Sequence, residues 1–380
     1  MRLPVNTGVL AWALKRSGRD QELYTSFPRL SEWLRGEASP TLRQLEAFAK
    51  ASRVPLGYLL LEAPPVDPLP IALFRTKREK DTHPSVASPE LVDTVHLMLR
   101  CQAWFREQLV EEGWEPLRFV RSAKLTASPE EVARQMKEVL GLGPTWIADH
   151  RNWTDALKAL IDKIDQAGIL VAVSGIVGNN THRILKVDEF RGFVLVDEYA
   201  PLVFVNGADA KAAQMFTLAH ELAHIWFGQS AAFDLRDLEP APDKIEQTCN
   251  RVAAEFLVPA ALLRRFWPSV HKTSNRFQVI AEQFRVSEIV AARRALELSL
   301  ITKEEFLRFY LAQTKRERRS QQGGGDFYAT QNLRIGRRFG EAVVRAAREG
   351  RLLYREAYRL IGLHGQSFDR YAEAILGMPA

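Results

Sequence analysis

Apolar residues recur at helical spacing along the N-terminal part of this chain. Residues up to Leu61 predict five short helices, at 7–16, 20–26, 29–35, 41–51 and 56–61, with breaks at Gly and Pro residues. The apolar positions of these helices supply a compact core: Leu10, Trp12, Leu30, Trp33, Leu42, Leu45, Phe48, Ala49 and Leu59. The pattern therefore predicts a small, all-helical N-terminal domain.

Further along, strand patterns join the helical ones. Three short β-branched or aromatic runs, at 168–173, 192–196 and 202–205, are bounded by Gly, Asp and Pro and predict strands. Long helices are predicted at 89–112, 212–227, 243–258, 330–349 and 352–363. This order predicts an α+β protein: a helical N-terminal domain, a middle domain with a small β-sheet, and a helical C-terminal region.

The helix predicted at 212–227 carries the sequence His220-Glu221-Leu222-Ala223-His224. Residues four apart share one helix face, so both imidazoles can reach one metal ion. Glu221 lies about 100° further round, where it can hold a water next to the metal without ligating the ion. Two imidazoles, an open coordination position and a carboxylate base are what a zinc peptidase needs. The alternative is a buried amphipathic helix that happens to carry two histidines.

A third metal ligand is expected from the helix predicted at 243–258. Glu246 lies on the apolar face of that helix, where a carboxylate is costly unless it is paired or bound to a cation. The opposite stripe, expected to face solvent, holds Lys244, Arg251 and Glu255. Glu246 is therefore favoured as the third ligand over Glu255 and over Asp243 in the capping turn. The alternative for Glu246 is a buried salt bridge to an arginine.

These two helices resemble the ImmA/IrrE family of metallo-endopeptidases. The resemblance rests on FTLAHELAH at 216–224 and EQTCNRVAAEFLVP at 246–259, and extends over roughly 128–300. In that family the two histidines and the glutamate of the second motif bind zinc, and the glutamate between the histidines is the catalytic base. Carried over, these residues are His220, His224, Glu246 and Glu221. The resemblance also implies a small sheet before the metal helix, suited to holding an extended peptide by edge pairing.

The stretch LSEWLRGEASPTL at 30–42 resembles the Cro/cI-type (XRE) helix-turn-helix domain. In that family the Trp packs in the core, and the Gly and Pro shape the turn after the recognition helix. Only Arg29, Ser31 and Arg35 are placed to reach a DNA groove, while Glu32 and Glu37 would repel phosphate. Operator binding and a protein-docking role both stay open, and we expect weak DNA binding through this domain.

Composition narrows the class of protein further. Apolar residues make up 46% of the chain, and the net charge of +6 permits acidic partners without demanding nucleic acid. Two cysteines, Cys101 and Cys249, are too few for a disulfide framework. Neither an apolar leader nor an 18-residue apolar run occurs, so we expect a cytoplasmic protein without membrane insertion.

Two basic stretches near the C-terminus are more ambiguous. A basic run at 315–319 precedes a Gly linker at 323–325, and a solvated helix end is favoured there over a nucleic-acid or acidic-partner contact. A basic-aromatic cluster follows, with an unassigned partner role: Phe327, Tyr328, Arg334, Arg337 and Arg338.

These patterns predict four parts: a helix-turn-helix domain at 1–66, a Pro-rich linker and bridging helix at 67–125, a metallopeptidase domain at 126–300, and a helical region at 301–380. The function expected is that of a Zn²⁺-dependent metallo-endopeptidase. The family resemblance implies a specific regulatory protein as substrate, such as a Cro/cI-type repressor, cleaved in a stress or mobile-element response.

The alternative is an antitoxin-like or transcriptional regulator that binds DNA and a toxin partner and uses its metal structurally. Glu221 favours the enzyme, because a structural site closes with a fourth protein ligand and needs no base.

Overall fold

The computed structural model of this chain describes residues 2–65, 72–73, 87–229, 231–233, 244–314 and 327–377. The chain divides into two compact units: 1–70 with 77–96, and 71–76 with 97–380. Helix α5 (Pro89–Glu111) contributes its first turns to the first unit and the rest to the second. No helix among the described residues combines the length and the apolar content needed to cross a membrane.

The named elements in the described part of the N-terminal unit are all helices, as its apolar spacing predicted. The side chain of Asn6 caps the first helix, Gly18 ends it in the left-handed conformation, and Thr41 and Gln44 form a capping box at the fourth. Leu42 is a wrong prediction as a core residue: it is the first residue after the Thr41 cap and is 45% exposed. The elements are α1 (Thr7–Ser17), α2 (Asp20–Ser26), α3 (Leu30–Leu34), α4 (Leu42–Ser52) and the 3-10 helix η1 (Leu56–Leu60).

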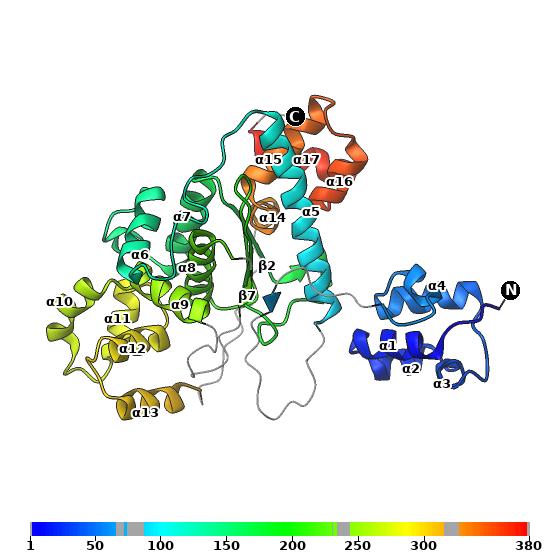
Figure 1. Cartoon of the computed structure of the whole chain (residues 1–380), viewed down its shortest axis with the longest axis horizontal. Coiled ribbons are helices and arrows are strands. Elements are labelled where there is room, and N and C mark those ends of the chain that lie inside the picture. Colours follow the sequence, from blue (N-terminus) through cyan, green and yellow to red (C-terminus); the bar gives the residue numbers. More distant parts are fainter. Residues whose placement is uncertain are drawn as a thin grey trace. The chain divides into compact units, whose positions relative to one another are not determined.

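A five-stranded mixed sheet in the order β1-β7-β5-β6-β2 organises the second unit (Figure 1). The three predicted strands are confirmed as β2, β5 and β6, with β2 parallel and β5 antiparallel to β6. The shorter strands and the β3–β4 hairpin lacked a recognisable apolar pattern. The strands are β1 (Ala72–Leu73), β2 (Leu170–Ser174), β3 (Ile176–Val177), β4 (Asn180–Ile184), β5 (Gly192–Leu195), β6 (Leu202–Asn206) and β7 (Ala231–Phe233).

Helix α8 (Lys211–Phe227) packs against β5 and β6, and α9 (Lys244–Leu257) packs against α8. The helix with the two histidines therefore lies between the sheet and α9, with α6 and α7 completing its surroundings. Both predicted helices are confirmed at close to their predicted ends. The other helices of this region are α6 (Pro129–Val139), η2 (Trp146–Asp149), α7 (Trp153–Gln166), α10 (Ala260–Val270), α11 (Arg276–Phe284), α12 (Glu288–Glu297) and α13 (Lys303–Thr314).

The C-terminal region differs from its prediction. The single helix expected at 330–349 is interrupted at Gly336, whose φ of 83° favours glycine. A Cβ atom at Gly336 would also lie only 3.1 Å from the Val171 carbonyl oxygen of β2. A last helix after Gly365 was not predicted. The observed helices are α14 (Phe327–Ile335), α15 (Arg337–Arg348), α16 (Tyr354–Ile361) and α17 (Gln366–Leu376).

This region packs on the sheet unit, with α14 beside β2 (Figure 1). Arg334 donates a hydrogen bond to Asn179 at 2.8 Å, Arg337 pairs with Glu341, and the Arg338 guanidinium lies over the rings of Phe105 and Trp114. The three arginines of the predicted basic-aromatic cluster are thus engaged in contacts within the unit. The basic run at 315–319 and the Gly linker at 323–325 lie outside the described residues.

Candidate metal centre

Helix α8 is buried all round, because the sheet covers one side and α9 another. Gly228 ends the helix in the left-handed conformation with its N–H bonded to the His224 carbonyl at 2.8 Å. The backbone N–H groups of Arg121 and Ala123 donate hydrogen bonds to the carbonyl oxygens of Ile225 and Trp226 in the last turn of the helix. The C-terminal half of the helix is therefore held firmly, and its histidines project from a rigid element.

Three side chains converge at the contact between α8 and α9. The Nε2 atom of His220 lies 3.1 Å from Oε2 of Glu246, and Nε2 of His224 lies 3.1 Å from Oε1 of the same carboxylate. The two Nε2 atoms are themselves 3.1 Å apart. One donor atom from each residue lies within 4.8 Å of the others. Helical phase predicted this meeting of His220, His224 and Glu246, and the structure brings them together.

The spacing and chemistry of these donors suit a metal ion. Bonds of about 2 Å in a tetrahedral site place ligand atoms slightly more than 3 Å apart. Burial lowers the pKa of His220, although the Glu246 carboxylate opposes that shift. For Glu246, burial favours the neutral acid, but hydrogen bonds and charge from His220 and His224 outweigh it and lower the pKa to about 2. A neutral imidazole and an ionised carboxylate are the forms that bind metals.

Glu221 lies beside the three donors and takes no part in their contacts. Its side chain is fully buried, and neither carboxylate oxygen has a hydrogen-bond partner among the described residues. Burial, and then the charge of Glu246, raises the pKa of Glu221 well above its ordinary value. A Cβ atom added to Gly192 at the start of β5 would lie 3.2 Å from Oε1 of Glu221, so this carboxylate lies directly against the sheet.

The environment of Glu255 corrects the sequence-based expectation that it faces solvent. It is 8% exposed, forms an ion pair with Arg294 of α12, and accepts the Ala260 N–H at 3.2 Å. The prediction was wrong because helical phase does not reveal a partner that lies 39 residues further along the chain. Arg251, on the same stripe, is exposed as predicted, and so is Lys244. A buried salt bridge to an arginine was the alternative role for Glu246. In the structure it is Glu255, and not Glu246, that forms such a salt bridge. Asp243 lies outside the described residues.

Two of the three predicted DNA-contacting residues of the N-terminal unit, Arg29 and Arg35, are paired with acids. Arg29 donates to Glu32 at 2.9 Å, and Arg35 donates to both oxygens of Glu37 at 2.7 and 2.8 Å. Ser31 is half-buried on α3. Phosphates would have to compete with these glutamates for both guanidinium groups.

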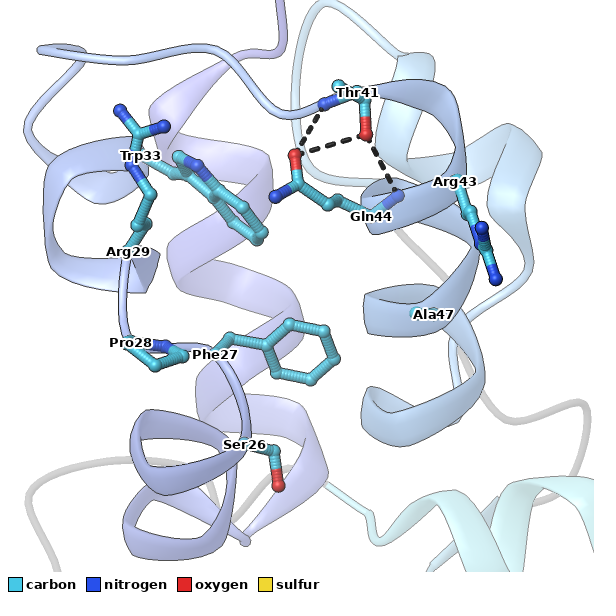
Figure 2. A pocket seen from close by; sticks show the side chains of 9 residues that line it. All are labelled: Ser26, Phe27, Pro28, Arg29, Trp33, Thr41, Arg43, Gln44 and Ala47. Carbon is cyan, nitrogen blue, oxygen red and sulfur yellow. Dashed lines mark hydrogen bonds between the residues drawn. The ribbon is translucent and has the colours of Figure 1, made fainter.

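A pocket of about 430 Å³ opens beside these residues, between α3 and α4 (Figure 2). The Phe27 and Trp33 rings line it, with centroids 6.1 Å apart. The Gln44 amide oxygen accepts hydrogen bonds from Thr41, and its side chain extends from α4 toward Trp33 (Figure 2). No carboxylate is among the residues that line the pocket: Ser26, Phe27, Pro28, Arg29, Trp33, Thr41, Arg43, Gln44 and Ala47. No sequence pattern indicated this pocket.

The fold and the site together define a candidate metallopeptidase: a small sheet, a buried His-Glu-x-x-His helix and a glutamate from the next helix. Residues 165–296 match the peptidase M78 family model, described as an IrrE N-terminal-like domain. This match spans all four site residues and supports a peptidase in this part of the chain. Residues 335–374 match a domain of unknown function, DUF8813. No curated protein and no solved structure matched the chain.

Proposed function

We propose that this chain is a zinc-dependent metallo-endopeptidase of the ImmA/IrrE type, with His220, His224 and Glu246 as ligands and Glu221 as the catalytic base. The observation that carries the proposal is the convergence of three metal-binding donors beside a buried carboxylate without hydrogen-bond partners among the described residues. The family match over 165–296 supports it independently.

Each residue has a separate task in the proposed reaction. A bound zinc ion supplies Lewis-acid chemistry at the scissile carbonyl. Glu246 is held ionised and His220 neutral, which are the protonation states that retain the ion. Glu221, with its raised pKa, is a stronger base than an exposed carboxylate. It takes the proton from the attacking water and returns it to the amine that leaves when the peptide bond breaks.

For the N-terminal unit we infer a Cro/cI-type helix-turn-helix domain at 1–66, joined through 67–125 to a peptidase domain at 126–300 and a helical region at 301–380. Its role is to dock a protein partner more than to read DNA. The pairing of Arg29 and Arg35 with glutamates supports this, as does the pocket lined by aromatic rings and free of carboxylates. Docking raises the effective concentration of a substrate near the peptidase.

The substrate that fits this arrangement is a cytoplasmic regulatory protein, such as a Cro/cI-type repressor, with an acidic and apolar surface segment. The Arg43 guanidinium at the pocket would attract the acidic part of that segment, and the aromatic rings would receive the apolar part.

One observation favours the rival function, an antitoxin-like regulator with a structural metal and a toxin partner. The side chains of His220, Glu221 and His224 are all 0% exposed, so the centre as described presents no open face to a peptide. A structural site, however, gains nothing from a buried carboxylate that does not ligate.

Zinc content and peptide cleavage of the full-length protein test the proposal. Glu221→Gln should keep about one zinc per chain and lose cleavage of a repressor-like substrate and of a denatured protein. His220→Ala with His224→Ala should lose the zinc, whereas Glu130→Gln, an exposed control on α6, should change neither property. Stoichiometric zinc in the double histidine variant would exclude the ligand assignment, and full cleavage by Glu221→Gln would exclude the enzyme mechanism.

A further inference from the structure

Strand β5 lies directly against the proposed catalytic base. A Cβ atom on its first residue, Gly192, would lie 3.2 Å from Oε1 of Glu221. β5 runs antiparallel to β6, the strand that precedes the metal helix α8. An extended peptide could pair with β5 as a further strand on the side away from β6. Its main chain would then lie within about 5 Å of Gly192, next to the base.

That side of β5 is already occupied by the chain itself. β7 pairs antiparallel with β5 there, with Phe233 opposite Gly192 and Ala231 opposite Val194. Opposed residues of antiparallel strands have Cα atoms about 4.5–5.5 Å apart, so the β7 backbone lies where the peptide would have to lie. β1 pairs in turn with the outer side of β7. Segments of the same chain therefore fill the edge that a substrate needs.

The burial of the metal centre agrees with an occupied edge. The side chains of His220, Glu221 and His224 are 0% exposed, whereas a working peptidase must bring a peptide carbonyl to the metal and the base. β7 has three residues and β1 has two, while β6 has five. Few backbone hydrogen bonds hold such short strands, so β7 and β1 are the part of the sheet that opens at the lowest cost.

We propose that β7 is an intramolecular pseudosubstrate: it occupies the peptide-binding edge of β5 and must leave before a substrate can pair there. This inference rests on the proposed function, because it assumes that β5 presents a peptide to the metal centre. The ligand that replaces β7 is an extended or unfolded protein segment, whose backbone N–H and C=O groups take over the pairing with β5. The buried centre is then that of a latent enzyme, and the fraction of molecules with β7 displaced limits the apparent affinity for substrate.

A reversible cross-link between β5 and β7 tests the proposal in the full-length protein. Val194→Cys with Ala231→Cys places thiols on register partners, at a Cα separation that a disulfide can span. The oxidised form should keep its zinc, lose cleavage of fluorescein-labelled casein and recover it on reduction. Val171→Cys with Val203→Cys joins β2 to β6 as the matched control and should cleave equally in both forms. Equal cleavage by the oxidised and reduced β5–β7 pair would overturn the proposal.

Weakening β7 should have the opposite effect. Ala232→Pro removes a backbone N–H from the strand, which disfavours its place within the sheet. A displaced state populated at about 0.1–10% in the parent protein would then become common, and kcat/KM for casein should rise by about 10-fold or more. Ala232→Ser keeps the backbone N–H and is the control. An unchanged or lower kcat/KM in zinc-loaded Ala232→Pro would contradict the proposal.

Hydrogen exchange provides a readout that does not depend on turnover. In the inactive Glu221→Gln protein, the backbone amides of β7 should exchange faster when casein is bound, while those of β2 and β6 stay as they are. Equal protection of β7 with and without bound casein would also overturn the inference. A parent protein that binds no zinc, or a zinc-loaded Ala232→Pro variant that cleaves no casein, would instead refute the proposed function itself.

Discussion

Glu255 of α9 forms a buried ion pair with Arg294 of α12. Arg294 also donates to the Val258 carbonyl at 3.0 Å, and the Glu255 carboxylate accepts the Ala260 N–H, so the pair closes the C-terminal end of α9. Glu246 lies at the other end of the same helix and faces the histidines of α8. The two glutamates therefore have different roles: Glu255 anchors the helix and Glu246 serves the metal centre.

This division predicts opposite phenotypes for two variants. Glu255→Ala leaves the Arg294 charge buried without its partner and should cost about 3–5 kcal/mol of unfolding free energy, measured by urea denaturation, while zinc affinity of the folded protein changes little. Glu246→Ala removes one of three ligands and should weaken zinc binding by orders of magnitude. Replacing both Glu255 and Arg294 by Leu and Met should recover much of the stability. Loss of zinc from a stable Glu255→Ala variant would contradict the assignment.

The close packing around Gly192 predicts that a substitution at this position lowers peptide cleavage and leaves zinc binding intact. A Cβ atom there would lie 2.5 Å from Cγ2 of Thr217, 2.8 Å from the Phe204 carbonyl oxygen and 3.2 Å from Oε1 of Glu221. Gly192→Ala should therefore force the Thr217 and Glu221 side chains away from β5, displace the base and lower the free energy of unfolding by about 1–3 kcal/mol. The three atoms nearest to the added Cβ belong to Thr217, Phe204 and Glu221 and to no zinc ligand, so zinc content should be retained while cleavage falls sharply.

Gly143→Ala is the control for that experiment, since nothing lies within 4 Å of its added Cβ. Equal cleavage by the two alanine variants would show that the close approach of β5 to Glu221 is irrelevant to catalysis.

Asp165 predicts a specific dependence of stability on pH. Burial, opposed by Arg338, raises the pKa of this carboxyl from 3.8 to about 6, and Oδ1 has no hydrogen-bond partner among the described residues. Between these two pH values the folded protein binds more protons at this site than the unfolded chain, so the contribution of Asp165 to stability falls as the pH rises. Asp165→Asn should therefore gain stability over the parent protein progressively from pH 4 to pH 6.

Urea denaturation of both proteins across that range measures the difference, with the exposed Asp188→Asn variant as control. A stability difference that stays constant with pH would contradict the raised pKa of Asp165.

DNA binding by the N-terminal unit should be weak and steeply salt-dependent. Arg29 and Arg35 are already paired with Glu32 and Glu37, so these two guanidinium groups are poorly placed to displace counterions from DNA. Charge reversal of both arginines should abolish the remaining binding in a mobility-shift titration and leave zinc content unchanged. Tight, sequence-specific and salt-sensitive binding by the parent protein would identify a repressor instead.

If the pocket between α3 and α4 docks the substrate, a substitution in it should weaken substrate binding without affecting the metal centre. Arg43→Glu should raise KM for the natural protein substrate and leave kcat and zinc content unchanged, because Arg43 lines the pocket and not the metal centre. Lys50→Glu, an exposed residue on the same helix, is the matched control. The substrate itself can be captured with the Glu221→Gln variant. The same KM for both charge reversals would show that this pocket plays no part in docking.

Local sequence was enough to determine much of this protein. Spacing of four residues put His220 and His224 on one face of α8, and the apolar stripe of α9 singled out Glu246. Glycines and prolines marked the ends of several predicted helices, and β-branched or aromatic runs marked β2, β5 and β6. These features are decided within one or two turns of chain, where periodicity and caps act directly.

Contacts between distant segments decided the rest. The burial of Glu255 depends on Arg294, the break at Gly336 depends on the Val171 carbonyl of β2, and the meeting of Glu246 with the two histidines depends on how α9 packs against α8. The short strands β1 and β7 exist only through their neighbours in the sheet. Periodicity shows which face of an element is apolar, but only tertiary packing determines which charged or polar group on another element meets it.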